Sequence, residues 1–553
     1  MKKTQLSLLA AIFMVSHFVS AQAVDQGKKF IYYQRYKSAK ETFEKVLASN
    51  PNDINAVYWL GQTLLQAPGE LKDTVAAKAL YQKALQTNGS APILLVGIGD
   101  IELREGKAAD ARQHFETAIG LTKGKDLAVL NAIGQANANF ENKNGDPAYA
   151  IEKLNQATQL KNFNSPETYI ILGDAYRKLV DGGNAVTSYQ KALTLDPKYA
   201  AAKYKIGKIY LTQNNKEYFL PAFEEAIQLD PSYAPAYYEL FYYWYFHGDV
   251  DKSSQYFDKY LTVTDPKPSD DYDKIALLYA AKKYQDCISA SQQKIGVLGG
   301  NADPRYYKLI AYCYNDQGDS VKAKNYLDQY FTKQKPDGYV VKDYSFYAQV
   351  LSKFPGNDSL VVLNYQAAID KDTSYENKLD LIKEASDIAK KTGNKPANAR
   401  WQGELYRLKK NPSNSDLYNW GFANYSAGNY KTADSLFCGT YEQKYPNEIF
   451  GYLWCAKSKA AQDDSTNSGG LAVDAYEKLA QMGRSLDSVK YKTQILGAYF
   501  YLAQYSNDIK KDKPAAIGYL KKILEVDPTN ATALQFIPML EKQAAQKPKS
   551  KGN

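Results

Sequence analysis

Residues 166–199 read PETYIILGDAYRKLVDGGNAVTSYQKALTLDPKY, and residues 200–233 repeat their landmarks as AAAKYKIGKIYLTQNNKEYFLPAFEEAIQLDPSY. The recurring columns are Gly173 and Gly207, Tyr176 and Tyr210, Tyr189 and Phe223, Ala192 and Ala226, and Pro197 and Pro231. A third copy runs to residue 267 and keeps the aromatic columns as Trp244 and Phe257. Several independent columns therefore agree on one period, which indicates a repeat architecture.

The spacing inside one copy predicts two helices. Leu172, Gly173 and Tyr176 share a face of the first helix. Ala185 and Tyr189 share a face of the second. A glycine inside a helix costs about 1 kcal/mol relative to alanine, so its recurrence indicates a contact that leaves no room for a Cβ. Pro197 ends the second helix. Each hairpin leaves an apolar face uncovered, so we expect the hairpins to stack.

These landmarks resemble those of the tetratricopeptide repeat (TPR) family. The second copy departs from the family at Phe219, where alanine is preferred, and the third has Phe241 in place of the glycine. The resemblance implies an all-α fold, a right-handed α-solenoid, and a binding role. It implies no chemistry.

The same landmarks recur along most of the chain and predict about fourteen hairpins, followed by a closing helix at 529–543. The strongest break is the proline-rich stretch 265–270, after which the pattern weakens. We therefore expect an N-terminal array at 22–267 and a more divergent array with the capping helix at 268–545. Residues 546–553 are predicted to be a disordered basic tail. The pattern leaves open whether the arrays form one superhelix or two arms.

The start of the chain predicts export. Lys2 and Lys3 precede a mostly apolar run, 6–19, and small residues at 20–23. This is typical of a secretory signal peptide, predicted at 1–21, although cleavage after Ala21 or Ala23 fits equally. We expect a bacterial protein that is soluble after cleavage, in the periplasm or associated with the outer membrane.

Composition argues against catalysis and against nucleic acid as a partner. The 553-residue chain has a formal net charge of +9, but only its tail forms a basic block. Of three histidines, one lies in the predicted signal and the others, His114 and His247, lie in different repeats. There is no metal-ligand spacing of Cys and His and no phosphate-binding glycine loop. We therefore predict no enzyme, no cofactor and no metal.

The four cysteines suggest two disulfides. Cys287 and Cys313 fall on neighbouring antiparallel helices of successive repeats at facing offsets, and so do Cys438 and Cys455. An exported protein meets an oxidising compartment, so we predict the bridges Cys287–Cys313 and Cys438–Cys455. The alternative is four ordinary buried thiols.

The resemblance places a partner-binding groove on the concave face that the first helices line. The groove positions include Tyr204, Lys208, Tyr238, Tyr242, Tyr245, Lys308, Tyr312, Tyr418, Phe422 and Tyr425. The same offsets place Lys178 on this face. Aromatic side chains with polar tips suit a protein or peptide partner. They suit a glycan as well, and the tyrosines could instead pack against each other.

One known TPR specificity is absent. The clamp for chaperone tails needs lysine and asparagine four residues apart on one first helix. At these offsets repeats two to seven carry Tyr58 and Gln62, Val96 and Asp100, Asn131 and Gln135, Ile170 and Asp174, Tyr204 and Lys208, and Tyr238 and Tyr242. The sequence thus predicts a non-enzymatic interaction scaffold in the cell envelope, with a glycan-binding protein as the alternative.

Overall fold

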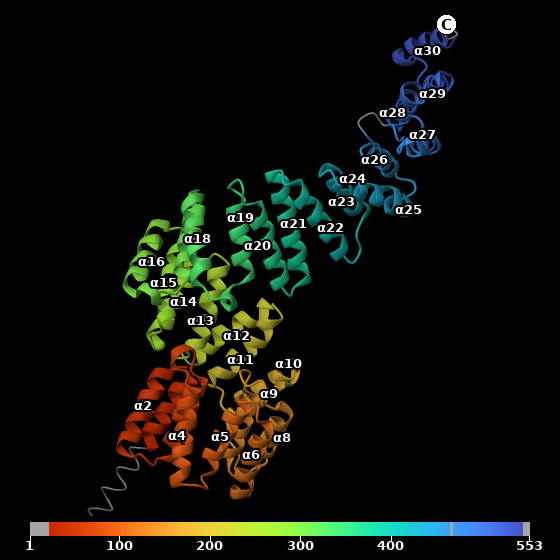
Figure 1. Ribbon diagram of the computed structural model, residues 1–553. Helices are drawn as coiled ribbons and strands as arrows, with labels where there is room; N and C mark the ends of the chain where they lie inside the picture. The colour runs from red at the N-terminus through yellow and green to blue at the C-terminus, as the bar shows by residue number, and fades with distance from the viewer. Residues whose placement is uncertain (1–20, 465–467, 546–553) are drawn as a thin grey trace, which may run out of the picture. The chain divides into compact units, whose positions relative to one another are not determined.

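The computed structural model describes residues 21–464 and 468–545 (Figure 1). All regular structure among these residues is helical, and consecutive helices pair into hairpins that stack side by side. The fold is therefore an all-α solenoid, as expected. The predicted signal peptide falls almost entirely on residues outside the described chain, and so does the predicted tail. Contacts divide the chain into two units, residues 1–293 and 294–553.

Unit 1 contains eight hairpins, counted over its described residues. Residues 21–32 are helical and pair with α2 (Tyr36–Ser49). The following hairpins are α3 (Ile54–Gln66) and α4 (Thr74–Thr87), α5 (Pro92–Arg104) and α6 (Ala108–Thr122), α7 (Leu127–Ala138) and α8 (Pro147–Thr158), α9 (Pro166–Lys178) and α10 (Gly182–Leu195), α11 (Ala200–Thr212) and α12 (Lys216–Leu229), α13 (Ala234–Phe246) and α14 (Val250–Val263), and α15 (Pro268–Ala280) and α16 (Tyr284–Leu298). The division between the units falls within α16.

Unit 2 continues with six hairpins and a closing helix, among its described residues. The first three are α17 (Arg305–Asp316) with α18 (Ser320–Lys333), α19 (Val341–Leu351) with α20 (Asp358–Lys371), and α21 (Tyr375–Thr392) with α22 (Lys395–Leu408). In the fourth, α23 (Asn414–Ser426) pairs with one continuous helix made of α24 (Tyr430–Asp434), the π-helical η4 (Ser435–Tyr441) and α25 (Glu442–Lys444). The last two are α26 (Ile449–Ala460) with α27 (Val473–Asp487), and α28 (Lys492–Gln504), which the π-helical η5 (Tyr505–Ile509) extends, with α29 (Lys513–Val526). The closing helix is α30 (Ala531–Ala545). The predicted number of hairpins is thus confirmed.

The recurring glycine fits under the recurring ring. A Cβ at Gly173 would lie 2.3 Å from the ring of Tyr189, which is fully buried. The ring of Tyr81 lies between Gly61 of its own hairpin and Gly97 of the next, where Cβ atoms would come within 2.2 and 2.7 Å of it. The large residue therefore fills the space inside its hairpin as well as the space to the neighbouring one, which fixes the stacking.

Short segments between the helices follow the turn signals of the sequence. The predicted insert in the second repeat forms a 3₁₀ turn at Gly69–Leu71. Proline begins α9, and Asp181 caps α10 by accepting a hydrogen bond from the backbone N–H of Asn184. No helix in the described ranges has the length and apolar character needed to cross a bilayer. The predicted domain boundary at 267–268 concerns the sequence pattern and stays a prediction.

Candidate functional site

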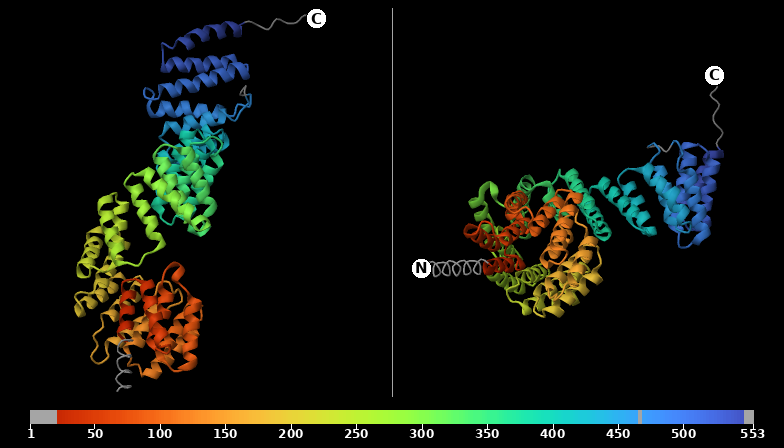
Figure 2. Two further views of the ribbon diagram at one scale, coloured as in Figure 1. Left: turned by 90° about the vertical axis from the view of Figure 1, so that its left-hand side faces the viewer. Right: turned by 90° about the horizontal axis from the view of Figure 1, so that it is seen from below.

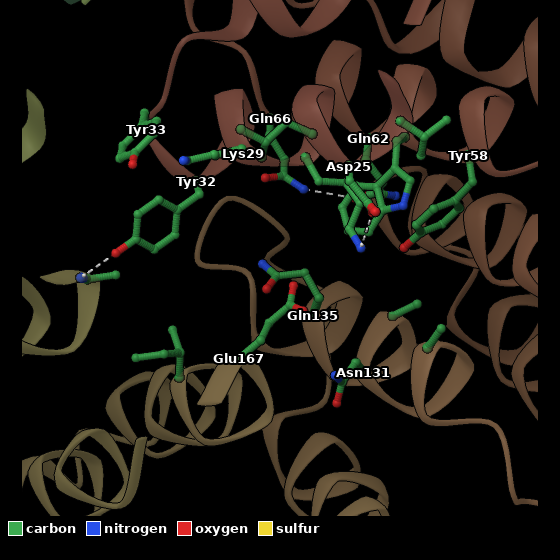
Figure 3. A pocket seen from close by; sticks show the side chains of 18 of the residues that line it. Asp25, Lys29, Tyr32, Tyr33, Tyr58, Gln62, Gln66, Asn131, Gln135 and Glu167 are labelled. Atoms are coloured by element: carbon green, nitrogen blue, oxygen red, sulfur yellow. Dashed lines mark hydrogen bonds and ion pairs between the residues drawn. The ribbon is translucent and has the colours of Figure 1, made fainter. Parts of the chain in front are cut away.

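The first helices of the early repeats surround a cavity of about 1340 Å³ in unit 1. Its wall comes from residues 21–32, α3, α7, α9 and the start of α11, with residues of the turns before α11 and α13. Figure 3 shows Asn131, Gln135 and Glu167 on one side of this cavity, facing labelled side chains of the first two repeats on the other. The concave face of the solenoid is therefore the inner wall of the cavity.

The first hairpin closes this wall by docking on the start of α11 and on the turns before α11 and α13. Tyr33 donates a hydrogen bond to Asp230 at 2.8 Å, and the hydroxyl of Tyr32 accepts one from the backbone N–H of Ala201 at 3.2 Å. The ring of Tyr32 packs edge-on against Tyr199 at 5.3 Å. In the view from below, the red first hairpin and the yellow helices belong to the same ring of helices (Figure 2). Unit 1 therefore forms a closed loop.

A second contact fixes the turn after the first helix. The carboxylate of Asp265 accepts hydrogen bonds from the Ser38 hydroxyl at 2.6 Å, the Ser38 backbone N–H at 2.9 Å and the Arg35 guanidinium at 3.1 Å. Burial acts to raise the pKa of Asp265, but these donors outweigh it and hold the pKa below its usual value. The proline-rich break in the sequence thus begins with the residue that anchors the first hairpin.

The inner wall mixes amide side chains with aromatic rings. The amides are Gln34, Asn50, Asn55, Gln62, Gln66, Asn131 and Gln135, and the rings are Tyr32, Tyr33, Tyr36, Tyr58, Trp59, Tyr199 and Tyr233. An amide both donates and accepts, which matches the alternating groups of a peptide backbone. The rings supply rigid contact area with a polar edge. The wall is thus suited to an extended, partly polar ligand.

Burial shapes the acid–base behaviour of the wall. It raises the pKa of Tyr32 to about 12 and that of Tyr233 well above its usual value. Glu167 is exposed to the cavity, and desolvation by the protein atoms around it raises the pKa of its carboxyl. Asp174 instead accepts hydrogen bonds from the ammonium of Lys205 at 2.8 Å. The phenols of this wall therefore stay neutral at physiological pH and act as hydrogen-bonding groups.

The groove residues that the sequence predicts in unit 1 bond across neighbouring repeats. Lys208 Nζ lies 2.6 Å from Glu239 Oε1 on the next first helix, and the Tyr204 hydroxyl donates to the same oxygen at 3.3 Å. One repeat further, the Tyr238 hydroxyl donates to Asp273 at 3.0 Å. These side chains therefore connect successive first helices, whatever else they bind.

The aromatic residues at the end of α13 are less enclosed. Tyr242 donates to Asp273 at 3.4 Å and stacks on Phe246, which is 75% exposed. Tyr245 lies against Phe241 with ring centroids 6.1 Å apart. Several of the predicted groove tyrosines thus pack against neighbouring side chains, which was the alternative to a binding groove. Their role in holding a partner stays a prediction.

Lys178 was also expected on the concave face, but its ammonium is bound within the protein. It donates to the backbone carbonyls of Asn137, Asn139 and Asn142 at 2.8, 3.0 and 2.7 Å. Burial lowers its pKa. Lys178 therefore fastens the inserted turn that follows α7.

In unit 2 the predicted residues fall into two groups. Lys308 Nζ lies 2.7 Å from Asp343, whose other oxygen accepts from the Tyr330 hydroxyl at 2.6 Å. Tyr312 packs on Phe346 with centroids 4.4 Å apart. Lys308 is therefore part of a buried network between repeats.

The second group gathers around a tryptophan that the sequence analysis did not select. Trp454 Nε1 donates to the Tyr418 hydroxyl at 2.8 Å, and the rings of Phe422 and Tyr425 each lie 4.9 Å from it. Tyr418 and Phe422 stack nearly parallel, and Phe422 is 39% exposed. The structure thus brings these three predicted residues together, and their use in binding stays a prediction.

Cys438 and Cys455 form a disulfide, one of the two pairings expected from the sequence. Their sulfur atoms lie near the Asp434 carboxylate, but two sulfurs bonded to each other are not available as metal ligands. Cys287 and Cys313 are both buried and lie in different units. The predicted bridge between them stays a prediction.

The two remaining histidines lie apart from the cavity wall. His114 Nδ1 is 2.8 Å from Glu102, and His247 Nδ1 is 2.8 Å from the Tyr243 carbonyl. Neither belongs to the residues that line the cavity. Each histidine therefore contacts a group of its own repeat.

The cavity itself was missed, although part of its signal was present. The two groove offsets fall on wall residues in early repeats, namely Tyr58 and Gln62, Asn131 and Gln135, and Ile170 and Asp174. The predicted groove residues were instead chosen for their tyrosines, which are most frequent in the later repeats. Glu167 lies at the second position of its repeat, which is also a groove offset, whereas Tyr32 reaches the wall through the docking of the first hairpin.

Comparison with known proteins identifies the repeats. Family models described as TPR repeat or tetratricopeptide repeat match residues 70–126, 173–214 and 200–233. No curated protein matches the chain. The crystal structure of the C-terminal part of a TPR repeat-containing protein from Cytophaga hutchinsonii is 30% identical, over 48% of this chain and 98% of that one, with a TM-score of 0.27.

Two further solved structures are similar. That of MamA is 27% identical over 30% of this chain and 93% of that one, with a TM-score of 0.24. That of yeast Tom70 is 14% identical over 75% of this chain and 97% of that one, with a TM-score of 0.36. The repeat matches, together with the 30% identity to the Cytophaga protein, show that this chain belongs to the tetratricopeptide repeat superfamily.

Proposed function

We propose that the chain is a non-enzymatic scaffold of the bacterial cell envelope that binds a segment of a protein partner in the cavity of unit 1. TPR arrays are protein-interaction scaffolds in general. The envelope location and the binding of a partner segment in the cavity are specific to this proposal. The observation that carries it is the closed inner wall, built from amides and aromatic rings on the first helices of successive repeats. A cavity of about 1340 Å³ exceeds the usual 300–1,000 Å³ of small-molecule sites, which favours a longer ligand.

The predicted signal peptide supports the envelope location. Its charge, apolar run and small residues are read from the sequence. Sequencing the N-terminus of the protein from fractionated cells tests this part. A chain that begins at Gln22 or Val24 in the periplasmic or outer-membrane fraction supports export, whereas an intact Met1 in the cytoplasm contradicts it.

Site-specific photo-crosslinking tests the partner. A photoreactive residue at Gln135, which points into the cavity in Figure 3, should crosslink in the native cells to a discrete protein. The same residue at Glu217, exposed on α12 and outside the wall, is the matched control. Equal crosslinking at both positions would contradict the proposal. A protease-resistant carbohydrate adduct at Gln135 alone would instead support the glycan alternative.

A further inference from the structure

The cavity differs in charge from the rest of the molecule. The whole chain carries a formal net charge of +9, whereas six carboxylates and four ammonium groups line the cavity. The carboxylates are Asp25, Asp53, Glu167, Asp174, Asp196 and Asp230, and the ammonium groups are Lys28, Lys29, Lys198 and Lys205. Low-dielectric walls focus the field of such an excess. The cavity therefore favours a positively charged occupant.

Five of the six carboxylates are already engaged. Asp174 and Asp230 bind Lys205 and Tyr33 as described, and Asp25 lies 3.7 Å from Lys28. The other two bind backbone N–H groups. Asp53 accepts from Ala56 at 3.0 Å, and Asp196 accepts from Lys198 at 2.9 Å. These five carboxylates therefore have protein partners before any ligand arrives.

Glu167 is the exception. Its carboxylate makes no hydrogen bond or ion pair with the residues that the structure describes, and it faces the interior of the cavity (Figure 3). Lys28 is the nearby charge that acts on it, but that ammonium is shared with Asp25 and lies 5.4 Å above the ring of Trp59. Glu167 is thus the one carboxylate of the cavity lining with no hydrogen-bond or ion-pair partner among the described residues.

Aromatic rings line the same cavity as this carboxylate, among them Tyr199 and Tyr32. Burial, followed by the charge of Glu167, raises the pKa of the Tyr199 phenol. The Tyr199 ring in turn packs against Tyr32. A guanidinium is planar and can meet a carboxylate through two hydrogen bonds while its face lies on a ring. This combination of groups matches arginine better than the compact ammonium of lysine.

We propose that the cavity binds an arginine side chain of an extended peptide, and that Glu167 is the carboxylate that receives it in the space that the rings of Tyr199 and Tyr32 also line. The proposal rests on the function proposed above and names the chemistry of the partner. Charge and shape favour it over a neutral sugar, because a sugar would leave the Glu167 carboxylate without a counter-charge.

Peptide selection is the first test. A random nonapeptide phage library is selected on the immobilised full chain, with the variant Gln135→Trp, which places an indole ring in the cavity, as the parallel target. Circular dichroism verifies that the variant is folded. We expect clones specific to the wild type that share one arginine position. Selected clones without a preferred arginine would overturn the arginine inference and leave peptide binding intact. No enrichment on the wild-type chain over a surface without protein would overturn peptide binding itself.

Titration is the second test. The best peptide is synthesised with arginine and with citrulline, which has nearly the same shape and no charge. On the wild-type chain the citrulline peptide should bind about tenfold or more weakly. On Glu167→Gln the two peptides should bind equally, whereas Glu41→Gln, exposed on α2 and outside the wall, should behave as the wild type. Equal binding of both peptides to the wild type would overturn the inference.

Discussion

At the scale of residues, the contact between a glycine and a large ring decides how closely two helices of a hairpin approach. Gly173 and Tyr189 form one such pair, and Gly207 and Phe223 form the next. The sequence predicts these pairs because both members recur at fixed offsets. A helix propensity scale alone would predict the opposite preference at the glycine.

Gly173→Ala therefore tests the packing. Helix propensity should stabilise the variant by about 1 kcal/mol, but the new Cβ would lie 2.3 Å from the Tyr189 ring. We expect a net loss of about 1–3 kcal/mol in the free energy of unfolding of unit 1. The control is Gly120→Ala on α6, where a Cβ meets no atom within 4 Å. Urea denaturation followed by circular dichroism measures both, and a stabilised Gly173→Ala would contradict the account.

Lys178 shows what a repeat pattern does not contain. Its offset predicts the concave face, but the end of α7 and the turn after it together present three carbonyls to its ammonium. Insertions interrupt the period, so contacts made by inserted residues have no counterpart in other repeats. The sequence therefore predicted the position of this side chain on its helix and missed its partners.

Replacing Lys178 should loosen the inserted turn. Lys178→Met removes the ammonium and leaves carbonyls in a partly buried site, which should cost about 1–3 kcal/mol. Hydrogen exchange of residues 139–146 should become faster. Lys161→Met, at an exposed lysine, is the control and should leave that exchange unchanged. Unaltered exchange in Lys178→Met would show that the turn is held by other contacts.

At the scale of elements, the first hairpin differs from the others in unit 1 because it contacts hairpins much later in the chain as well as the hairpin that follows it. Its docking uses Tyr32, Tyr33, Arg35 and Ser38 against residues about 170 to 230 positions later in the chain. A repeat pattern describes contacts between adjacent hairpins only. The number of hairpins in a closed turn depends on small rotations that accumulate from repeat to repeat, so the sequence did not predict this closure.

Asp265→Asn should weaken this docking. The change removes a charge that receives hydrogen bonds from Ser38 and Arg35, at a cost of about 1–3 kcal/mol. Amide exchange in residues 21–49 should become faster, whereas Asp258→Asn, at an exposed position on α14, should have no effect. Equal protection in both variants would contradict the role of Asp265.

Low pH should weaken the docking of the first hairpin in the wild type in the same way. The pKa of Asp265 is lower in the docked state than its usual 3.8, so Asp265 stabilises the docked hairpin fully at any pH above 3.8. This stabilisation is lost as the pH falls through the lowered pKa. Exchange in residues 21–49 should therefore rise below about pH 4 in the wild type and change less in Asp265→Asn. A similar rise in both proteins would assign the effect to other groups.

The disulfide acts on another element, the irregular second helix of the twelfth repeat. Cys438 lies in the π-helical segment η4 and joins Cys455 on α26, 17 residues later. We expect reduction to cost about 3 kcal/mol of stability in unit 2 by the chain-entropy estimate. Thermal unfolding with and without reductant measures this, and the double variant Cys438→Ser, Cys455→Ser should not respond to reductant. A wild type that is equally insensitive would contradict the prediction.

At the scale of the whole molecule, the sequence predicted the fold far better than the site. Every hairpin carries some part of the landmark pattern, so even the faint eleventh repeat forms α21 and α22 around the buried Trp401. The site depends on which repeats meet across unit 1. That information lies in the docking of Tyr32 and Tyr33, not in the periodic columns.

The docked first hairpin has a topological consequence. A polypeptide that passes through the loop of helices in unit 1 is encircled by it, so it can leave only by sliding out end first or when the hairpin detaches. A partner with a bulky folded domain on each side of the bound segment could neither thread in nor slip off. Its residence time would then be set by the rate at which Tyr33 and Asp265 give up their contacts.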